Sequence, residues 1–259
     1  MLKLSIITIN YNNLKGLKRT VESVVNQTWQ EFEYIVIDGG STDGSVDFIE
    51  SQSKNIDYWV SEPDSGIYNA MNKGIIKAIG DYLLFLNSGD HFFSNTVLKE
   101  NHYRIVDCDL VYFNIEVKGD NISEIVPYPE KLRFSDFYFG TLCHQSTFIK
   151  KVLFDKFGLY DENLKIVSDW KFFIVALFKY DCSYLKVDTI LTTYYLDGIS
   201  SELANKRIFY EEKQEVLNSD FKGNFEDTNE LFDLRKLISN LRKSKKIKWL
   251  VKLGLLNKF

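Results

Sequence analysis

Polar side chains suited to binding a nucleotide follow three apolar segments of the chain. The segment LSIITIN runs into Tyr11, EYIVID ends on Asp38, and YLLFLNSGD ends on Asp90. An aromatic ring can stack on a nucleobase, and a carboxylate can accept hydrogen bonds from base N–H groups or ribose hydroxyls. Ligands of open α/β sheets bind at the carboxyl ends of the strands. The segments therefore predict a nucleotide site, although Tyr11 would also suit the rim of the fold and Asp38 a turn cap.

Two more polar segments supply candidates for the same site. Asp64 and Gly66 lie in the turn EPDSG, where glycine would let the backbone approach a ligand, and a plain turn is an equal interpretation. His144 is flanked by polar groups in CHQS rather than by an apolar stripe. It is predicted either to contact phosphate, acceptor or metal, or to be a hydrogen-bonded structural histidine.

Strands and helices must alternate to bring these side chains to one edge. Apolar runs and helical spacing predict strands at 4–10, 33–38, 57–61 and 82–86, and helices at about 14–26, from about 42 onward, and at about 67–79. Such alternation predicts βαβ units with right-handed crossovers. The expected fold class is α/β, a mostly parallel sheet flanked by helices.

The pattern changes after Asp90. We expect a helix near 95–106, a hairpin around 119–121, a helix near 168–180 and a strand near 183–188. Residues beyond about 203 are predicted to be helical. The sequence thus predicts an α/β domain over 1–202 and a C-terminal helical extension over 203–259.

The extension ends in a basic segment. From Arg235 onward it carries nine Lys or Arg residues and no acid, interleaved with Trp249 and aliphatic residues. An amphipathic helix of this kind suits an anionic membrane surface. The alternative is a helix that packs its apolar face on the enzyme and leaves its basic face in solvent.

Charge and composition exclude several classes of protein. The 259 residues carry a formal net charge of −4, so the part before the basic segment is clearly acidic, which argues against nucleic acid as its ligand. The cysteines, Cys108, Cys143 and Cys182, are widely spaced and suit reduced thiols. The first residues form a strand rather than a signal peptide, and no apolar run is long enough to span a bilayer. We therefore expect a cytoplasmic protein.

Four motifs together resemble family 2 glycosyltransferases of the GT-A fold. They are IITINYNN, VIDGGSTDGS, EPDSGIYNAMNKG and LFLNSGD, and the resemblance covers about residues 3–200. It implies a nucleotide-sugar donor, with a UDP-sugar favoured, a divalent metal (Mg²⁺ or Mn²⁺) and a single-displacement, inverting transfer. It also implies donor contacts at Tyr11, Asp38, Asp64 and Gly66. Gly39 stands here where relatives commonly carry a second aspartate.

The resemblance implies chemical roles for the later motifs. The family's metal motif usually reads Asp-x-Asp, whereas residues 87–90 read NSGD. Asp90 is then the expected metal ligand, and Asn87 the expected contact to the sugar or a further oxygen ligand. Asp169 lies where the family carries the acid that deprotonates the acceptor hydroxyl, with a helix N-cap as the alternative. His144 is expected in the nucleotide-sugar site.

The expected function is transfer of a sugar to a glycan or lipid-linked glycan during synthesis of a cell-surface polysaccharide. The protein would be cytoplasmic, or peripheral on the inner face of the cell membrane. The segment Leu196–Ser201 resembles a loop that closes over the donor, with Asp197 where many relatives have histidine.

Two alternative functions remain. A nucleotidyltransferase would carry a basic, Gly-rich loop after the first strand, which residues 11–14 lack. A catalytically inactive sugar-nucleotide-binding or scaffold protein is favoured by the acids missing at positions 87 and 89. Donor hydrolysis in the presence of Mn²⁺ separates it from an enzyme.

Overall fold

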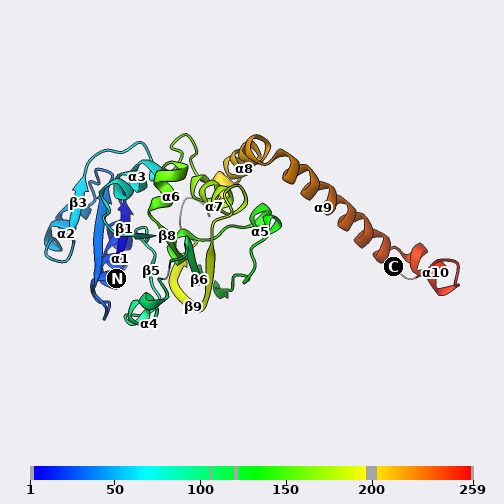
Figure 1. Cartoon of the computed structure of the whole chain (residues 1–259), viewed down its shortest axis with the longest axis horizontal. Coiled ribbons are helices and arrows are strands. Elements are labelled where there is room, and N and C mark those ends of the chain that lie inside the picture. Colours follow the sequence, from blue (N-terminus) through cyan, green and yellow to red (C-terminus); the bar gives the residue numbers. More distant parts are fainter. Residues whose placement is uncertain (1–2, 106, 120–121, 197–202, 258–259) are drawn as a thin grey trace. The chain divides into compact units, whose positions relative to one another are not determined.

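The structure, a computed structural model, describes residues 3–105, 107–119, 122–196 and 203–257 (Figure 1). The chain divides into two compact units between Lys213 and Gln214. The first unit holds an α/β fold of the predicted class. The domain boundary predicted at 202/203 stays a prediction, and the expected loop role of Asp197 lies outside the described residues.

Strands and helices alternate through the N-terminal half, as the sequence predicts. The elements are β1 (Leu4–Asn10), α1 (Leu14–Val25), β2 (Phe32–Asp38), α2 (Ser45–Ser51), β3 (Tyr58–Ser61), α3 (Ile67–Lys77) and β4 (Tyr82–Phe85). β1 pairs in parallel with β2 and β4, and β2 pairs in parallel with β3. The register places Asn10 beside Asp38, and Asp38 beside Ser61, so the carboxyl ends of three strands meet.

The C-terminal half continues the same sheet with a mixture of strand directions. Its elements are β5 (His91–Phe92), α4 (Val97–Asn101), β6 (Leu110–Gly119), β7 (Ile122–Val126), α5 (Phe134–Phe139), β8 (Thr147–Lys150), α6 (Val152–Phe157), α7 (Ser168–Phe178), β9 (Tyr184–Tyr195) and α8 (Lys206–Asp220). The strand order over the described residues is β3-β2-β1-β4-β8-β6-β9-β5, with β7 beside β6. β8 runs antiparallel to β4 and β6, so the sheet is parallel on one side of β4 and mixed on the other.

Helices cover both faces of the parallel part. Leu4 and Ile6 belong to the same buried cluster as Leu17 of α1. Ile7 faces the other way, toward α3, where a Cβ added to Gly74 would lie 2.5 Å from the Ile7 Cγ2 atom. Because successive side chains of a strand point to opposite faces, α1 and α3 cover opposite sides of β1.

Two elements differ in length from the sequence-based expectation. The helix expected at 95–106 is shorter, because α4 ends at Asn101 and a 3₁₀ turn (His102–Arg104) follows it. The Asn101 side chain donates to the Val97 carbonyl, a local bond that competes with helix continuation. The strand expected at 183–188 extends instead to Tyr195, because TILTTYY is rich in β-branched and aromatic residues and pairs with β6 after a shift of register.

The second unit is helical. It contains α9 (Lys222–Lys243) and α10 (Lys245–Lys252), which contact one another. Trp249 is 61% exposed and Leu253 is 52% exposed, so both apolar side chains remain open. Among the described residues, no helix combines the length and the apolar character needed to cross a membrane.

Candidate active site

Asp38 organises the loops that follow the first three strands. Its carboxylate accepts hydrogen bonds from the Asn10 side chain, from the hydroxyls of Ser41 and Ser61, and from the backbone N–H groups of Gly40 and Ser41, at 2.6–3.2 Å. Burial of Asp38 opposes ionisation, but the hydrogen bonds from Ser41, Ser61 and Asn10 outweigh it and lower the carboxyl pKa below its ordinary value. The side chain is fully buried and caps the turn, which was the alternative to its expected contact with the nucleotide. That contact stays a prediction.

A second group of residues lies beside the loops that Asp38 holds. It consists of Tyr11, Gly39 and Asp64. Tyr11 is 66% exposed. A Cβ added to Gly39 would lie 2.5 Å from Asp64 Oδ2 and 3.2 Å from Tyr11 Cδ2. The turn is held by the Gly66 N–H, which donates to Asp64 Oδ1 at 3.0 Å, and Gly66 has the positive φ of 129° that favours glycine. An aromatic face and a carboxylate thus border one exposed spot.

The loop of residues 87–90 is fastened to α1. The Thr20 hydroxyl donates to the Asp90 carbonyl at 2.6 Å and accepts from the Gly89 N–H at 2.9 Å. Asn13, at the start of the helix, donates to the Ser88 carbonyl at 3.1 Å. Thr20 was not singled out from the sequence, because nothing in a helical threonine signals such a distant contact. The bonds fix the loop in place beside the first strand's end.

Asp90 is the only acid of this loop, and it is 6% exposed. Its Oδ2 accepts from Gln145 Nε2 at 3.1 Å, and its Oδ1 from the Tyr195 N–H at 3.4 Å. No group of three or more His, Cys, Asp or Glu side chains in the described ranges is arranged to hold a metal ion. A hard carboxylate oxygen suits Mg²⁺ or Mn²⁺. The donor set thus fits an ion that takes one protein ligand and is held otherwise by phosphate oxygens and water.

Asp169, His144 and Asn87 form a continuous chain of hydrogen bonds. The His144 Nδ1 atom lies 2.9 Å from Asp169 Oδ2, and its Nε2 lies 3.2 Å from Asn87 Nδ2. An amide nitrogen can only donate, so His144 accepts through Nε2 and donates its Nδ1 proton to the carboxylate. The Tyr68 hydroxyl donates to Asp169 Oδ1 at 2.9 Å. Asn87 Oδ1 is buried and has no hydrogen-bond partner among the described residues.

Asp169 is the second residue of α7. Val167 stands at the N-cap position of this helix and makes no side-chain capping bond. Burial of Asp169 opposes ionisation, but the hydrogen bonds that His144 and Tyr68 donate outweigh it and lower the carboxyl pKa below its ordinary value. Asp169 therefore stays ionised at neutral pH and is bound to side chains from other elements. Tyr68 had not been predicted, because its spacing in α3 suits an ordinary core aromatic.

The three groups of residues are adjacent. Gln145, which bonds Asp90, directly follows His144, which bonds Asp169 and Asn87. The structure therefore brings the predicted residues of the two later motifs to one place. Tyr11, Asp64 and Gly66 lie together on the loops after β1 and β3, and the bond between Asn13 and Ser88 links those loops to residues 87–90.

The chain resembles known glycosyltransferases in sequence. The sequence model of the family described as Glycosyl transferase family 2 matches residues 5–158. An uncharacterised glycosyltransferase of Mycobacterium tuberculosis is 34% identical over 215 residues, which cover 79% of each chain. A PGL/p-HBAD biosynthesis glycosyltransferase of Mycobacterium bovis is 30% identical over 175 residues, covering 65% of this chain and 67% of the relative.

Solved structures share the fold at low sequence identity. Residues 1–349 of S. aureus TarS in complex with UDP-GlcNAc match with a TM-score of 0.67 and 23% identity, over 85% of this chain and 68% of that one. The match to a longer TarS chain covers 40% of it. The mannosyltransferase PcManGT from Pyrobaculum calidifontis, in complex with GDP-Man and Mn²⁺, matches with a TM-score of 0.61 and 13% identity, over 82% of this chain and 64% of that one.

Proposed function

The chain belongs to glycosyl transferase family 2, and on this premise we propose that it transfers a sugar from a nucleoside-diphosphate sugar to an acceptor hydroxyl with inversion. The observation that carries the proposal is a pair of hydrogen bonds made by adjacent residues: His144 bonds the Asp169 carboxylate, and Gln145 bonds the Asp90 carboxylate. Asp169 would then serve as the base and Asp90 as the carboxylate at the donor diphosphate.

We place the nucleotide on the cluster of Tyr11, Gly39 and Asp64. The exposed Tyr11 ring offers a stacking surface, and the Asp64 carboxylate can accept from base N–H or ribose hydroxyl groups. Asp38 would hold the loops that present these two side chains. A UDP-sugar is the favoured donor, since UDP-GlcNAc is the ligand of the structural relative TarS. Gly66 would let the backbone approach the nucleotide.

Asp90 would hold Mg²⁺ or Mn²⁺ at the donor diphosphate, where such an ion neutralises the charge of the leaving group. Asn87 would accept a hydrogen bond from a hydroxyl of the donor sugar through its unpartnered Oδ1. Such a bond would satisfy a buried amide oxygen that has no hydrogen-bond partner among the described residues.

The proton of the acceptor hydroxyl would pass to Asp169. As the acceptor oxygen bonds to the anomeric carbon, the bond from that carbon to the diphosphate oxygen breaks on the opposite face. The bonding electron pair leaves with the nucleoside diphosphate, so the anomeric configuration inverts. His144 and Tyr68 would hold the carboxylate in one orientation through its two oxygens.

The acceptor is proposed to be a glycan or lipid-linked glycan of the cell surface. This follows the similarity to a PGL/p-HBAD biosynthesis glycosyltransferase. The basic segment from Arg235, with its exposed Trp249, would dock on the anionic inner face of the cell membrane. The protein would then act in the cytoplasm as a peripheral membrane enzyme.

Nucleotide binding and product stereochemistry test the proposal. Thermal unfolding is followed with UDP, GDP and UDP-GlcNAc, with and without Mn²⁺, because a ligand of the folded state raises the unfolding temperature by mass action. Donor hydrolysis then reports turnover, and NMR of the transferred sugar reports its anomeric configuration. Absence of stabilisation by any nucleotide would refute the proposal. Nucleotide binding with no hydrolysis at any Mn²⁺ concentration would favour the inactive sugar-nucleotide-binding protein.

A further inference from the structure

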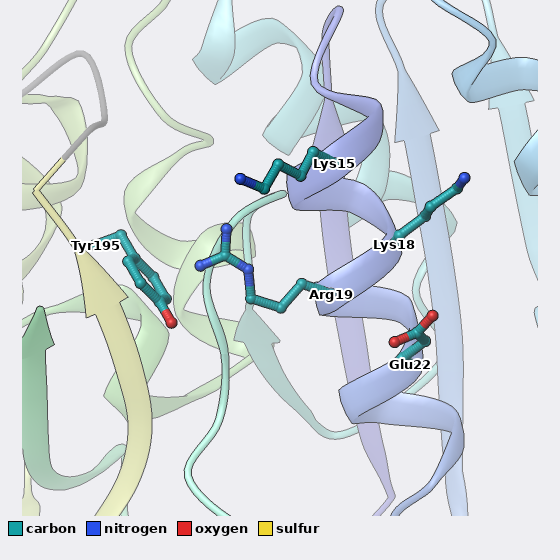
Figure 2. A pocket seen from close by; sticks show the side chains of 5 residues that line it. All are labelled: Lys15, Lys18, Arg19, Glu22 and Tyr195. Atoms are coloured by element: carbon teal, nitrogen blue, oxygen red, sulfur yellow. The ribbon is translucent and has the colours of Figure 1, made fainter.

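A basic hollow lies along α1, beside the loop of residues 87–90. Its volume is about 590 Å³, and Lys15, Lys18, Arg19, Glu22 and Tyr195 line it. Figure 2 shows Lys15 and Arg19 reaching from the helix toward the Tyr195 ring at the end of β9. The hollow is shallow and open to solvent rather than an enclosed cavity. Three cations and one acid therefore border a space large enough for an anionic group.

The three cations of this hollow form no ion pair with acids of the described residues, although Glu22 lines the hollow beside them. The Arg19 guanidinium lies over the Tyr195 ring, 4.0 Å from its centroid, and Lys18 lies 5.6 Å from the Phe48 ring. No carboxylate in the described part of the chain forms an ion pair with Lys15, Lys18 or Arg19. Elsewhere in the first unit, lysines do pair, as Lys171 does with Asp161 at 2.8 Å. The three cations of the hollow are available to an anion.

The hollow is built onto the candidate active site. Thr20, the neighbour of Arg19, bonds the Asp90 carbonyl, and the Tyr195 N–H donates to the Asp90 carboxylate. Asp90 is thus bonded to Tyr195 itself and to Thr20, the residue next to Arg19. The nucleotide residues Tyr11 and Asp64, in contrast, lie on the loops after β1 and β3. A ligand in the hollow would contact α1 and the end of β9 instead.

We propose that this hollow binds a phosphate group of the acceptor molecule. The inference rests on the proposed function, because a transferase brings two substrates to one centre and the cluster of Tyr11 and Asp64 accounts only for the nucleotide. Arg19 presents a planar fork of donors that matches phosphate oxygens, with its orientation fixed by the Tyr195 ring. Lys15 adds a mobile point charge. The class of acceptor selected is therefore a phosphate-bearing glycan carrier rather than a neutral sugar.

Two probes test the site while UDP occupies the donor site. Farnesyl diphosphate, a soluble prenyl diphosphate, and inorganic phosphate are titrated by calorimetry into the full chain with saturating UDP, and again without UDP. Lys15→Gln and Arg19→Gln are each expected to weaken binding of farnesyl diphosphate about 10-fold, because each removes a charge-assisted hydrogen bond to the phosphate. UDP affinity should not change. Lys54→Gln, which removes an exposed lysine elsewhere, is the matched control.

The outcomes are separable. Binding of both probes indicates recognition of phosphate itself, and binding of farnesyl diphosphate alone indicates a lipid-linked acceptor; either supports the proposal when Lys15→Gln and Arg19→Gln weaken it. Displacement of the probe by UDP would overturn it, because the hollow would then hold the donor diphosphate. Absence of probe binding in a protein that binds UDP would also overturn it. Failure of UDP to bind would refute the proposed function. The titration without UDP would still show whether the hollow binds the probes.

Discussion

Asp169 is the residue on which the proposed chemistry depends most. Both carboxylate oxygens are already hydrogen-bonded, one by His144 and one by Tyr68, and the lowered pKa keeps the group ionised. A base held in this way needs no rearrangement before it receives a proton. Replacing Asp169 by asparagine keeps the shape of the side chain, so this substitution tests whether Asp169 acts as a base.

We expect Asp169→Asn to bind donor normally and to lose roughly 10²–10⁴-fold in kcat for transfer, because an amide cannot accept the proton. Donor affinity is measured by thermal unfolding with UDP, and transfer by release of UDP from the donor. Asp155→Asn, the same change at an exposed position of α6, is the control. Near-normal turnover of Asp169→Asn would show that the acid serves only the structure.

Asp90→Asn tests the metal ligand. The amide oxygen can replace only one of the two carboxylate acceptors, so we expect the protein to fold with either the bond from Gln145 or that from the Tyr195 N–H lost. It removes the carboxylate charge, and binding of Mg²⁺ or Mn²⁺ at the diphosphate should weaken. The measurement is donor hydrolysis across a Mn²⁺ titration, together with UDP binding with and without Mn²⁺. Equal Mn²⁺ dependence in both proteins would place the ion elsewhere.

Asp38 contributes stability that depends on pH. A carboxyl whose pKa is lower in the folded state stabilises it above the unfolded pKa, about 3.9 for Asp, and this contribution disappears as pH falls through the folded value. We expect Asp38→Asn to lower the unfolding temperature at pH 7, and the difference from wild type to shrink on acidification below about pH 4. Thermal unfolding at several pH values measures this difference in unfolding temperature. A difference that grows toward low pH would contradict the stabilising role of the Asp38 carboxylate.

Among the elements, α1 and α3 hold the site from opposite faces of β1. α3 contributes Tyr68, and it approaches the sheet closely at Gly74. An added methyl would meet the Ile7 side chain at 2.5 Å, a distance at which something must move. Any shift of α3 away from the sheet at this point would also move Tyr68, because Gly74 and Tyr68 belong to the same helix.

Gly74→Ala is expected to destabilise the folded state by about 1–3 kcal/mol, the usual cost of overpacking a core. The same change at Gly223, where a Cβ would meet nothing within 4 Å, is the matched control and should be neutral or slightly stabilising. Both are read from urea denaturation. If Gly74→Ala is as stable as wild type, the helix shifts easily and the contact with Ile7 does not set its position.

The alternation of strands and amphipathic helices up to β4 could be predicted from the sequence, because the spacing of apolar residues indicates which side chains are buried. β8 and β5 were not predicted, because β5 has only two residues and β8 has only two apolar residues, Phe148 and Ile149, which two lysines follow directly. The contact between His144 and Asp169, and that between Tyr68 and Asp169, join residues 25 and 101 positions apart. Such contacts depend on packing between elements, which local patterns do not encode.

At the scale of the whole molecule, the acidic first part and the basic end of the chain predict different partners. In the second unit, α10 presents Trp249 and Leu253 to solvent beside several lysines. We expect the full chain to bind vesicles that contain anionic lipid, and to bind them less as salt rises, because exposed charges are screened over about 8 Å at physiological ionic strength. Binding that survives high salt would measure apolar insertion.

Replacing Lys245, Lys246 and Lys248 of α10 by Gln should weaken vesicle binding by roughly 10²-fold, since each basic residue near an anionic surface contributes about 1 kcal/mol. Truncation before Arg235 should abolish vesicle binding and leave donor hydrolysis intact, because the nucleotide cluster, Asp90 and Asp169 all belong to the first unit. Co-sedimentation with phosphatidylglycerol vesicles measures both variants, and pure phosphatidylcholine vesicles are the control. If the intact chain ignores anionic vesicles and the truncated chain unfolds, the helices stabilise the enzyme and the membrane proposal is wrong.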